Sequence, residues 1–192
     1  MKISVITATY NSEKTVRGTF ESVLHQTHHN IEYIIIDGGS KDNTLNIIRE
    51  YEPKFNGCMH WISEPDNGIY DAMNKGIAMA TGDVIGVLNS DDFYTDEFVL
   101  SDIAAIFTKQ NPDCVYGNLE FVDAADTAKV FRTWIGSQYT PGAFLKGWHP
   151  AHPTFYARRA CFEQYGGFDL SFEISADFEL MLRFIEKNGC SN

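Results

Sequence analysis

Short apolar runs alternate with segments of helical periodicity in the first half of the chain. Each apolar run stops at a polar group, as a strand buried in a sheet does. The predicted strands are residues 3–7, 33–36, 59–62 and 84–88. The predicted helices, with apolar residues three or four positions apart, are residues 13–25, 44–51, 69–80 and 97–109. Strands that alternate with helices indicate an α/β fold with a Rossmann-like, mostly parallel sheet flanked by helices.

The pattern changes near Pro112. Two short predicted strands follow, residues 114–116 and 119–122, and then a loop rich in Gly, Pro and Trp from 136 to 153. Two further helices are predicted after that loop. We therefore place a soft boundary near Pro112 within one compact domain.

Charge and cysteine content narrow the class of protein. The chain has 15 Lys and Arg against 26 Asp and Glu, a net charge of −11. Nucleic-acid binding rests mainly on Lys and Arg, so we expect no nucleic-acid partner, and any bound phosphate should be held by a metal ion or backbone N–H groups. The four cysteines form no Cys-x-x-Cys pair, which argues against a zinc ribbon or a disulfide-dense secreted domain.

Targeting signals are not recognisable in the sequence. The N-terminal apolar run is too short for a signal peptide, and no stretch approaches the roughly 18 to 20 apolar residues of a membrane helix. We therefore expect a soluble protein of a reducing compartment, most simply the cytoplasm.

Three predicted strands end in polar clusters, residues 7–11, 37–40 and 89–92. Ligands of open α/β sheets bind beyond the carboxyl ends of the strands, so the three clusters together favour one site. Each cluster taken alone is equally consistent with an ordinary turn. The segment after Asp37 contains neither the dinucleotide-binding glycine pattern nor a P-loop, but Asp37 itself is suited to accept a hydrogen bond from a base N–H.

Asp91 and Asp92 form a costly like-charge pair unless a positive charge lies beside them. A divalent cation, Mg²⁺ or Mn²⁺, bridging to a diphosphate would remove that cost. The alternative is a solvated pair of acids before the next helix, where the helix dipole stabilises negative charge.

Four segments occur in a characteristic order: residues 6–11, 36–44, 63–76 and 88–92. Together they resemble family 2 glycosyltransferases of the kind that builds bacterial surface polysaccharides. The resemblance covers nearly the whole chain. It implies the GT-A fold, a nucleotide-sugar donor that is most often a UDP-sugar, a saccharide or lipid-linked acceptor, and inversion at the anomeric carbon.

The resemblance also implies roles for the donor-side residues. Four residues after the first strand would line the nucleotide pocket, with the aromatic one stacking near the base: Thr7, Thr9, Tyr10 and Asn11. Asp37 would bind the base. Asp66, Tyr70 and Asn74 would close around nucleotide and sugar, and Lys75 would be a partner for phosphate.

Asp92 matches the metal ligand of the family, whereas Asp91 would contact ribose or sugar. The proton of the acceptor hydroxyl would pass to Asp177, which follows a Gly-Gly-Phe-Asp segment as the family's catalytic acid does. Many relatives have Glu before that Asp, and this chain has Ala176. The alternative for Asp177 is a helix cap with no catalytic role.

Two further features concern recognition of the ligands. Many relatives carry a second acid where this chain has Gly38, which removes only the weaker base contact. Trp148 and His152 are expected on the acceptor side, Trp148 by stacking on a sugar face, and the His-x-x-His spacing lacks the partners of a zinc site.

These inferences divide the domain into a nucleotide-sugar-binding half, residues 1–112, and an acceptor-side half, residues 113–192, which we expect to be truncated at its C-terminus. Truncation would allow a nucleotide-sugar-binding fragment without turnover as an alternative. A nucleotidyltransferase is a third reading, but its usual basic phosphate loop is absent. We expect peripheral membrane association at most, and the oligomeric state is not encoded in any pattern we recognise.

Overall fold

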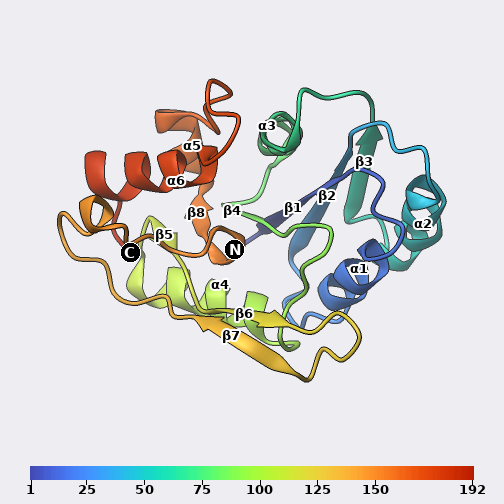
Figure 1. The fold of residues 1–192 in the computed structure, drawn as a ribbon, viewed down its shortest axis with the longest axis horizontal. Helices are drawn as coiled ribbons and strands as arrows, with labels where there is room; N and C mark the ends of the chain where they lie inside the picture. Colours follow the sequence, from blue (N-terminus) through green and yellow to red (C-terminus); the bar gives the residue numbers. More distant parts are fainter.

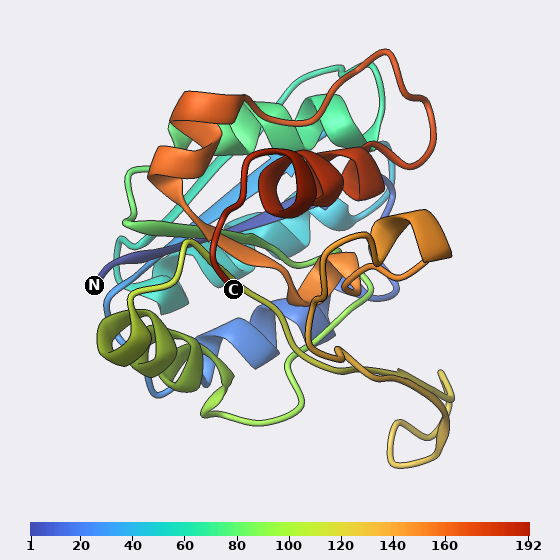
Figure 2. The same cartoon turned by 90° about the vertical axis from the view of Figure 1, so that its left-hand side faces the viewer.

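The computed structural model describes all 192 residues, and its centre is a six-stranded sheet (Figure 1). The strand order is β3-β2-β1-β4-β8-β5. The strands of this sheet are β1 (Ile3–Thr9), β2 (Ile31–Asp37), β3 (Met59–Ser63), β4 (Val84–Val87), β5 (Cys114–Val115) and β8 (Tyr156–Arg158). A separate antiparallel pair, β6 (Leu119–Val122) and β7 (Val130–Trp134), projects from the body of the molecule (Figure 2).

The helices follow the predicted pattern closely. They are α1 (Val16–Leu24), α2 (Thr44–Tyr51), α3 (Ile69–Met79), α4 (Val99–Gln110), α5 (Arg159–Tyr165) and α6 (Ala176–Met181). Four shorter helical segments are η1 (Glu52–Phe55), η2 (Phe144–Lys146), η3 (His152–Thr154) and η4 (Leu182–Lys187), and η4 continues α6 as a π-helix. None of these helices is both long enough and apolar enough to cross a membrane.

Strands β1 to β4 run parallel, as the alternation of strands and helices predicts. In register, Thr9 lies beside Asp37, and Asp37 lies beside Ser63. The polar residues that follow these strands therefore meet at one edge of the sheet. Strands β7 and β8 were not predicted, and β8 is antiparallel to β4, which makes the sheet mixed.

Apolar side chains cover both faces of the sheet. On one face, Ile34 and Ile36 of β2 pack with α3, α5 and α6. On the other face, Tyr33 and Ile35 pack with α1, α2 and α4. Because alternate residues of a strand point to opposite faces, a strand covered on both sides needs apolar residues at every position, and the Tyr-Ile-Ile-Ile run of β2 meets this requirement.

Candidate active site

The first polar cluster, at the end of β1, divides between structural and exposed positions. Thr7 is fully buried, and its hydroxyl donates to the Leu88 carbonyl (2.8 Å) and contacts the Tyr33 hydroxyl (3.1 Å). Thr7 thus joins β1 to the segment after β4 rather than lining a pocket. Tyr10, by contrast, is 64% exposed, so its ring is accessible for stacking with a ligand.

Asp37 is the most extensively hydrogen-bonded carboxylate of the site. It is fully buried and accepts five hydrogen bonds, from the hydroxyls of Thr9, Ser40 and Ser63 and from the backbone N–H groups of Gly39 and Ser40. These bonds order the loop that follows β2. In this conformation neither carboxylate oxygen is free for a base, so the predicted base contact would require Asp37 to exchange one of its present donors.

Hydrogen bonds between loops bring the three clusters together, as predicted. The backbone N–H of Asn11 donates to Ser40 Oγ (2.8 Å), and the Lys41 N–H donates to Asn11 Oδ1 (2.8 Å). The hydroxyls of Ser12 and Ser90 lie 2.9 Å apart and join the first cluster to the third. Asn11 has a positive φ of 51°, a conformation that asparagine tolerates better than most residues. Asn11 therefore shapes the turn from which Tyr10 projects.

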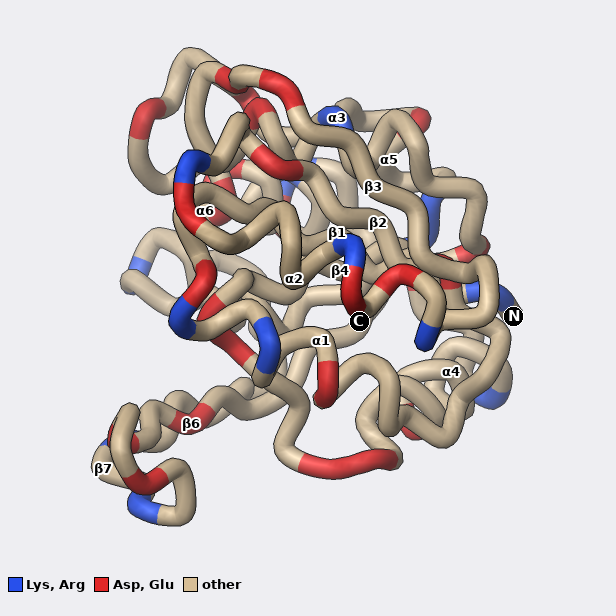
Figure 3. Tube along the Cα trace, turned by 90° about the vertical axis from the view of Figure 1, so that its right-hand side faces the viewer, with Lys and Arg blue, Asp and Glu red and all other residues tan.

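A cavity of about 630 Å³ opens beside these loops. It is lined by Ala8, Thr9, Tyr10, Ser12, Gly38, Pro65, Asp66, Gly68, Ile69, Ala72 and Ser90. Its size suits a small-molecule ligand. No Lys or Arg lines it, although Figure 3 shows basic as well as acidic positions spread over the rest of the chain. The cavity therefore provides no cationic side chain for a phosphate group.

The Asp66 carboxylate lies directly against Gly38 in the lining of this cavity. Its Oδ1 accepts a hydrogen bond from the Gly68 N–H (3.0 Å). Its Oδ2 lies 2.5 Å from the point where a Cβ on residue 38 would stand. The Asp66 carboxylate, which comes from a different loop, thus fills the space that a second acid at position 38 would occupy. Asp66 Oδ2 accepts no hydrogen bond within the protein.

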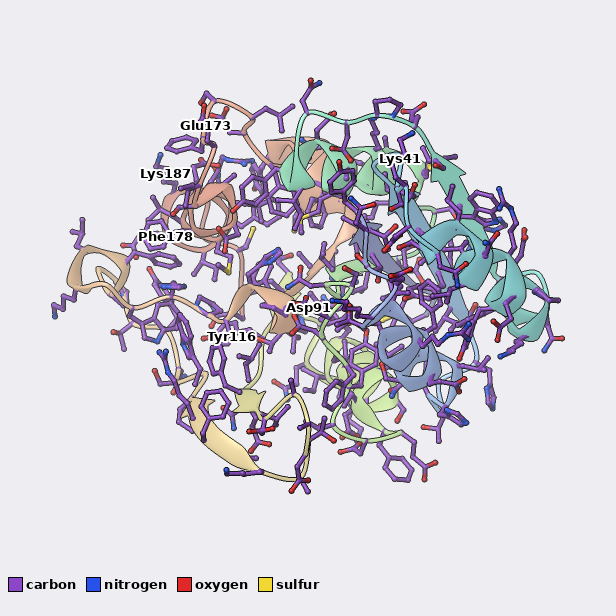
Figure 4. All side chains as sticks on the ribbon, turned by 45° about the vertical axis from the view of Figure 1, so that its right-hand side comes forward. Lys41, Asp91, Tyr116, Glu173, Phe178 and Lys187 are labelled. Atoms are coloured by element: carbon purple, nitrogen blue, oxygen red, sulfur yellow. The ribbon has the colours of Figure 1, made fainter.

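Asp92 follows β4 and lies close to Asn89, whose side-chain amide donates to Asp92 Oδ2 (2.8 Å). Burial raises the pKa of Asp92, the Asn89 hydrogen bond opposes this, and repulsion from Asp91 adds to the rise. Asp91 is exposed, and in the view of Figure 4 it falls between the two halves of the chain, with Phe178 and Tyr116 of the second half to its left.

The residues after β4 fit a divalent cation of the kind that binds nucleotides. No group of three or more His, Cys, Asp or Glu side chains forms a complete metal site. Mg²⁺ and similar ions are, however, commonly held by one or two carboxylates together with substrate phosphates and water. The half-buried Asp92 carboxylate beside Asp91 offers hard oxygen ligands. A cation there would offset both the burial and the repulsion from Asp91 that raise the pKa of Asp92.

Lys75 does not line the cavity. Its ammonium group pairs with Glu64 Oε1 (2.8 Å) and donates to the Pro65 carbonyl (3.1 Å). The Glu64 carboxylate raises the pKa of Lys75, so the charge stays in place. Lys75 supports the loop that carries Asp66, and its contact with phosphate stays a prediction.

Tyr70 and Asn74 face the second half of the chain instead of the cavity. The Tyr70 hydroxyl donates to Asp177 Oδ1 (3.0 Å). Asn74 makes two hydrogen bonds of 2.8 Å with the backbone N–H and carbonyl of Phe168. Four residues apart, the two side chains share one face of α3, and this face connects the donor half to α6.

Asp177 itself is not a helix cap in this structure. Ser175 occupies the cap position of α6, no side-chain capping hydrogen bond is made there, and Asp177 lies within the first turn. Its carboxylate is half-buried and engages Tyr70, which leaves the cap alternative without structural support.

The acceptor-side residues lie among aromatic rings. Trp148 packs on Tyr116, Tyr139 and Phe144 with ring centroids 5.3 to 5.8 Å apart. His152 meets Phe168 edge-on at 5.6 Å, and burial lowers the pKa of His152 while the nearby Asp177 opposes this.

Sequence reasoning did not single out several residues of this region. Ser12 and Ser90 join two loops. The available signal was that Ser12 directly follows the first polar cluster and that Ser90 lies within the third. Tyr116, Tyr139 and Phe178 belong to the aromatic group around Trp148, and no spacing along the chain connects them.

Comparison with known proteins agrees with this arrangement. The glycosyl transferase family 2 model matches residues 4–168. An uncharacterized glycosyltransferase of Mycobacterium tuberculosis is 32% identical over 191 residues, which covers 94% of this chain and 68% of the relative. A PGL/p-HBAD biosynthesis glycosyltransferase of Mycobacterium bovis is 30% identical over 181 residues, with the same coverage.

Solved structures show the same fold. Residues 1–349 of S. aureus TarS in complex with UDP match with a TM-score of 0.74 at 23% identity, over 95% of this chain and 54% of that chain. The mannosyltransferase PcManGT of Pyrobaculum calidifontis, in complex with GDP-Man and Mn²⁺, matches with a TM-score of 0.73 at 17% identity, over 98% and 53%. The present chain thus spans about half the length of these two solved chains.

These matches confirm the predicted GT-A fold and glycosyltransferase class. Because the family match runs from β1 to Phe168 and includes all four ordered segments, the chain belongs to glycosyl transferase family 2.

Proposed function

We propose that this chain transfers a sugar from a nucleoside diphosphate donor, a UDP-sugar in the first instance, to an acceptor hydroxyl with inversion at the anomeric carbon. Residues 1–112 would hold the donor, and residues 113–192 would provide the acceptor side. A saccharide or a lipid-linked saccharide is the proposed acceptor. Complexes of TarS with UDP and with UDP-GlcNAc support the choice of a uridine nucleotide.

The observation that carries this proposal is the cavity at the carboxyl ends of the parallel strands. Its walls include Asp66 and reach Ser90, next to the Asp91–Asp92 pair, yet no cationic side chain lines it. A diphosphate bound among these acids would be repelled unless a cation accompanied it. The same surroundings therefore favour a donor that binds together with Mn²⁺ or Mg²⁺.

Asp92 is the residue that would hold the metal, with Asp91 beside it toward the ribose or sugar. When bound, the metal would neutralise the leaving diphosphate as a Lewis acid. The Mn²⁺ in the complex of PcManGT with GDP-Man supports this part of the proposal.

The chain's own residues account for the other requirements of donor binding. Thr9 and Tyr10 would line the nucleoside site from β1, and the Asp66 carboxylate would accept a hydrogen bond from the base or ribose.

Asp177 would serve as the base. In a single displacement, the acceptor oxygen forms a bond to the anomeric carbon while the bond to the diphosphate oxygen breaks, and the acceptor proton passes to Asp177. Asp177 Oδ1 already accepts a hydrogen bond from Tyr70, which leaves Oδ2 to take the proton. His152 and the aromatic group around Trp148 would border the acceptor.

Nucleotide binding is tested by thermal shift with UDP, GDP, dTDP and CDP, each with Mn²⁺, Mg²⁺ or EDTA. A ligand of the native state raises the melting temperature by mass action. We expect a shift with UDP that requires metal and is lost in Asp92→Asn. Asp102→Asn, an exposed acid on α4, is the matched control. A UDP shift that is equal in EDTA would refute the metal assignment.

Turnover is tested by release of UDP from UDP-sugars, with water or simple alkyl glycosides as acceptors. We expect Asp177→Asn to bind UDP as tightly as the parent but to lose at least 100-fold in kcat, within the range by which a general base accelerates proton transfer, about 10²–10⁴. Glu173→Gln, an exposed acid a few residues away, is the control and should leave kcat unchanged. Binding without any turnover in the parent would favour the nucleotide-sugar-binding fragment.

A further inference from the structure

Tyr70 connects the donor cavity to the proposed base. The two residues just before it, Gly68 and Ile69, line the cavity, whereas the Tyr70 side chain points away from it and reaches the first turn of α6. The hydrogen bond to Asp177 spans 107 positions of the sequence at 3.0 Å. The start of α3 therefore lines the cavity through Gly68 and Ile69 and reaches Asp177 through the Tyr70 side chain.

The Tyr70 ring is held firmly in this place. It stacks on Phe168 with centroids 5.4 Å apart and an interplanar angle of 27°. Phe168 is in turn fixed by Asn74, whose Nδ2 donates to the Phe168 carbonyl and whose Oδ1 accepts from the Phe168 N–H. Asn74 also lies so close to Gly167 that a Cβ on residue 167 would stand 2.3 Å from Asn74 Oδ1. The phenol hydroxyl is consequently directed at Asp177 by packing that does not involve Asp177 itself.

The Asp177 carboxylate depends on Tyr70 for its orientation. It makes no capping hydrogen bond, and Tyr70 is its one side-chain partner in the protein. Ser175, two residues earlier, has a positive φ of 70°, so the backbone turns sharply just before α6. The turn brings Asp177 to the Tyr70 hydroxyl.

The hydroxyl remains a donor at every pH at which such enzymes are assayed. Burial raises the pKa of Tyr70, and the Asp177 carboxylate raises it further, partly offset by hydrogen bonding from the backbone of Asp177 and Ser175. A neutral phenol beside a carboxylate has one favourable arrangement, in which the phenol donates and the carboxylate accepts.

We propose that Tyr70 is a positioning residue for the transfer reaction: it holds Asp177 Oδ1 so that Oδ2 alone faces the acceptor hydroxyl. This inference rests on the proposed function, with Asp177 as the base. The resemblance implied that Tyr70 contacts the nucleotide and sugar, whereas this inference assigns Tyr70 to the base.

The test is Tyr70→Phe, which keeps the ring and its stacking on Phe168 and removes only the hydroxyl. A hydrogen bond to a charged group typically contributes enough for a roughly 10- to 100-fold effect. We expect kcat for UDP release from the UDP-sugar to fall by that factor, while KM for the UDP-sugar and the UDP-induced thermal shift stay unchanged. A merely structural role would instead lower the melting temperature without this separation of kcat from KM.

Tyr51→Phe is the matched control. The Tyr51 hydroxyl donates to the Glu21 carboxylate at 2.5 Å on the far face of the sheet, so this variant also loses a tyrosine-to-carboxylate bond. We expect it to keep the parent kcat. In the Asp177→Asn background, Tyr70→Phe should cause no further loss in kcat, because Tyr70 would act only through the base, which Asp177→Asn has already removed.

The outcomes distinguish failure of the proposed function from failure of the positioning role. An inactive parent, or an Asp177→Asn variant as active as the parent, overturns the proposed function. A parent that needs Asp177 while Tyr70→Phe retains full kcat overturns the positioning role alone. A fall in UDP affinity with unchanged kcat would return Tyr70 to the nucleotide site and also overturn it.

Discussion

Gly38→Ala tests whether the Asp66 carboxylate recognises the nucleotide. A Cβ at position 38 would stand 2.5 Å from Asp66 Oδ2, whereas ordinary contacts begin at 3.4 Å, so the carboxylate must withdraw by about 0.9 Å. The φ of Gly38 is not in the positive region, so alanine itself is not strained there. The substitution should therefore act on the position of Asp66 rather than on the fold.

The expected effect on binding follows from the contact that is displaced. A hydrogen bond to a charged group contributes about 2 kcal/mol, which corresponds to a roughly 30-fold weaker Kd. The atom that must move is the terminal carboxylate oxygen of the Asp66 side chain, not backbone, so the melting temperature of the free protein should stay unchanged within about 2 °C. The Kd for UDP with Mn²⁺, measured by isothermal titration calorimetry, is the readout.

A double-mutant cycle makes the prediction specific. If Gly38→Ala acts through Asp66, adding it to Asp66→Ala should cost nothing further in Kd. Gly18→Ala is the control, because a Cβ on Gly18 in α1 meets no atom within 4 Å and should leave Kd unchanged. An unchanged Kd in Gly38→Ala, or an equal loss with and without Asp66, would show that this carboxylate does not read the nucleotide.

Two further predictions concern stability. Burial opposes ionisation of Glu32, but hydrogen bonds from Ser4, Thr81 and Lys2 outweigh this effect and lower the pKa of Glu32 from 4.5 to about 2. The ionised carboxylate therefore contributes about 3 kcal/mol to the free energy of unfolding. This contribution is present above pH 4.5 and disappears as the pH falls to 2. Urea unfolding at pH 6 and pH 3 should show a smaller loss of stability between the two for Glu32→Gln than for the parent, and equal losses would contradict this assignment. Gly86→Ala would place a Cβ 2.1 Å from the buried Tyr156 ring and should destabilise the fold by about 3 kcal/mol, a fall in melting temperature of roughly 6–12 °C, whereas an unchanged melting temperature would mean that the ring can yield.

The sequence alone predicted β1 to β4, the helices between them and the family. Local pattern suffices for such elements, because strands buried on both faces require continuous apolar runs and amphipathic helices require a spacing of three to four. The polar clusters at the strand ends were recognisable for the same reason, since parallel strands place their carboxyl ends at one edge. Four ordered motifs then identified the family.

The positions of β7 and β8 depended on the tertiary structure. Strand β8 has three residues and no alternating pattern, and it enters the sheet because Gly86 of β4 leaves room for the Tyr156 ring. A contact between residues so far apart in the chain leaves no local signal.

For the candidate site, too, the sequence indicated the residues and the tertiary structure decided their contacts. The position of Asp37 at a strand end predicted a base contact, and the family resemblance implied roles for Asp66, Tyr70 and Asp177, but neither indicated which of these side chains would be free to meet a ligand. Asp37 is satisfied by five donors from three segments, while Asp66 leaves one oxygen open over Gly38. Helical spacing placed Tyr70 and Asn74 on one face of α3, and only the packing of α3 against α6 decided that this face meets Asp177, because hydrogen bonds between distant segments are set by how the layers pack.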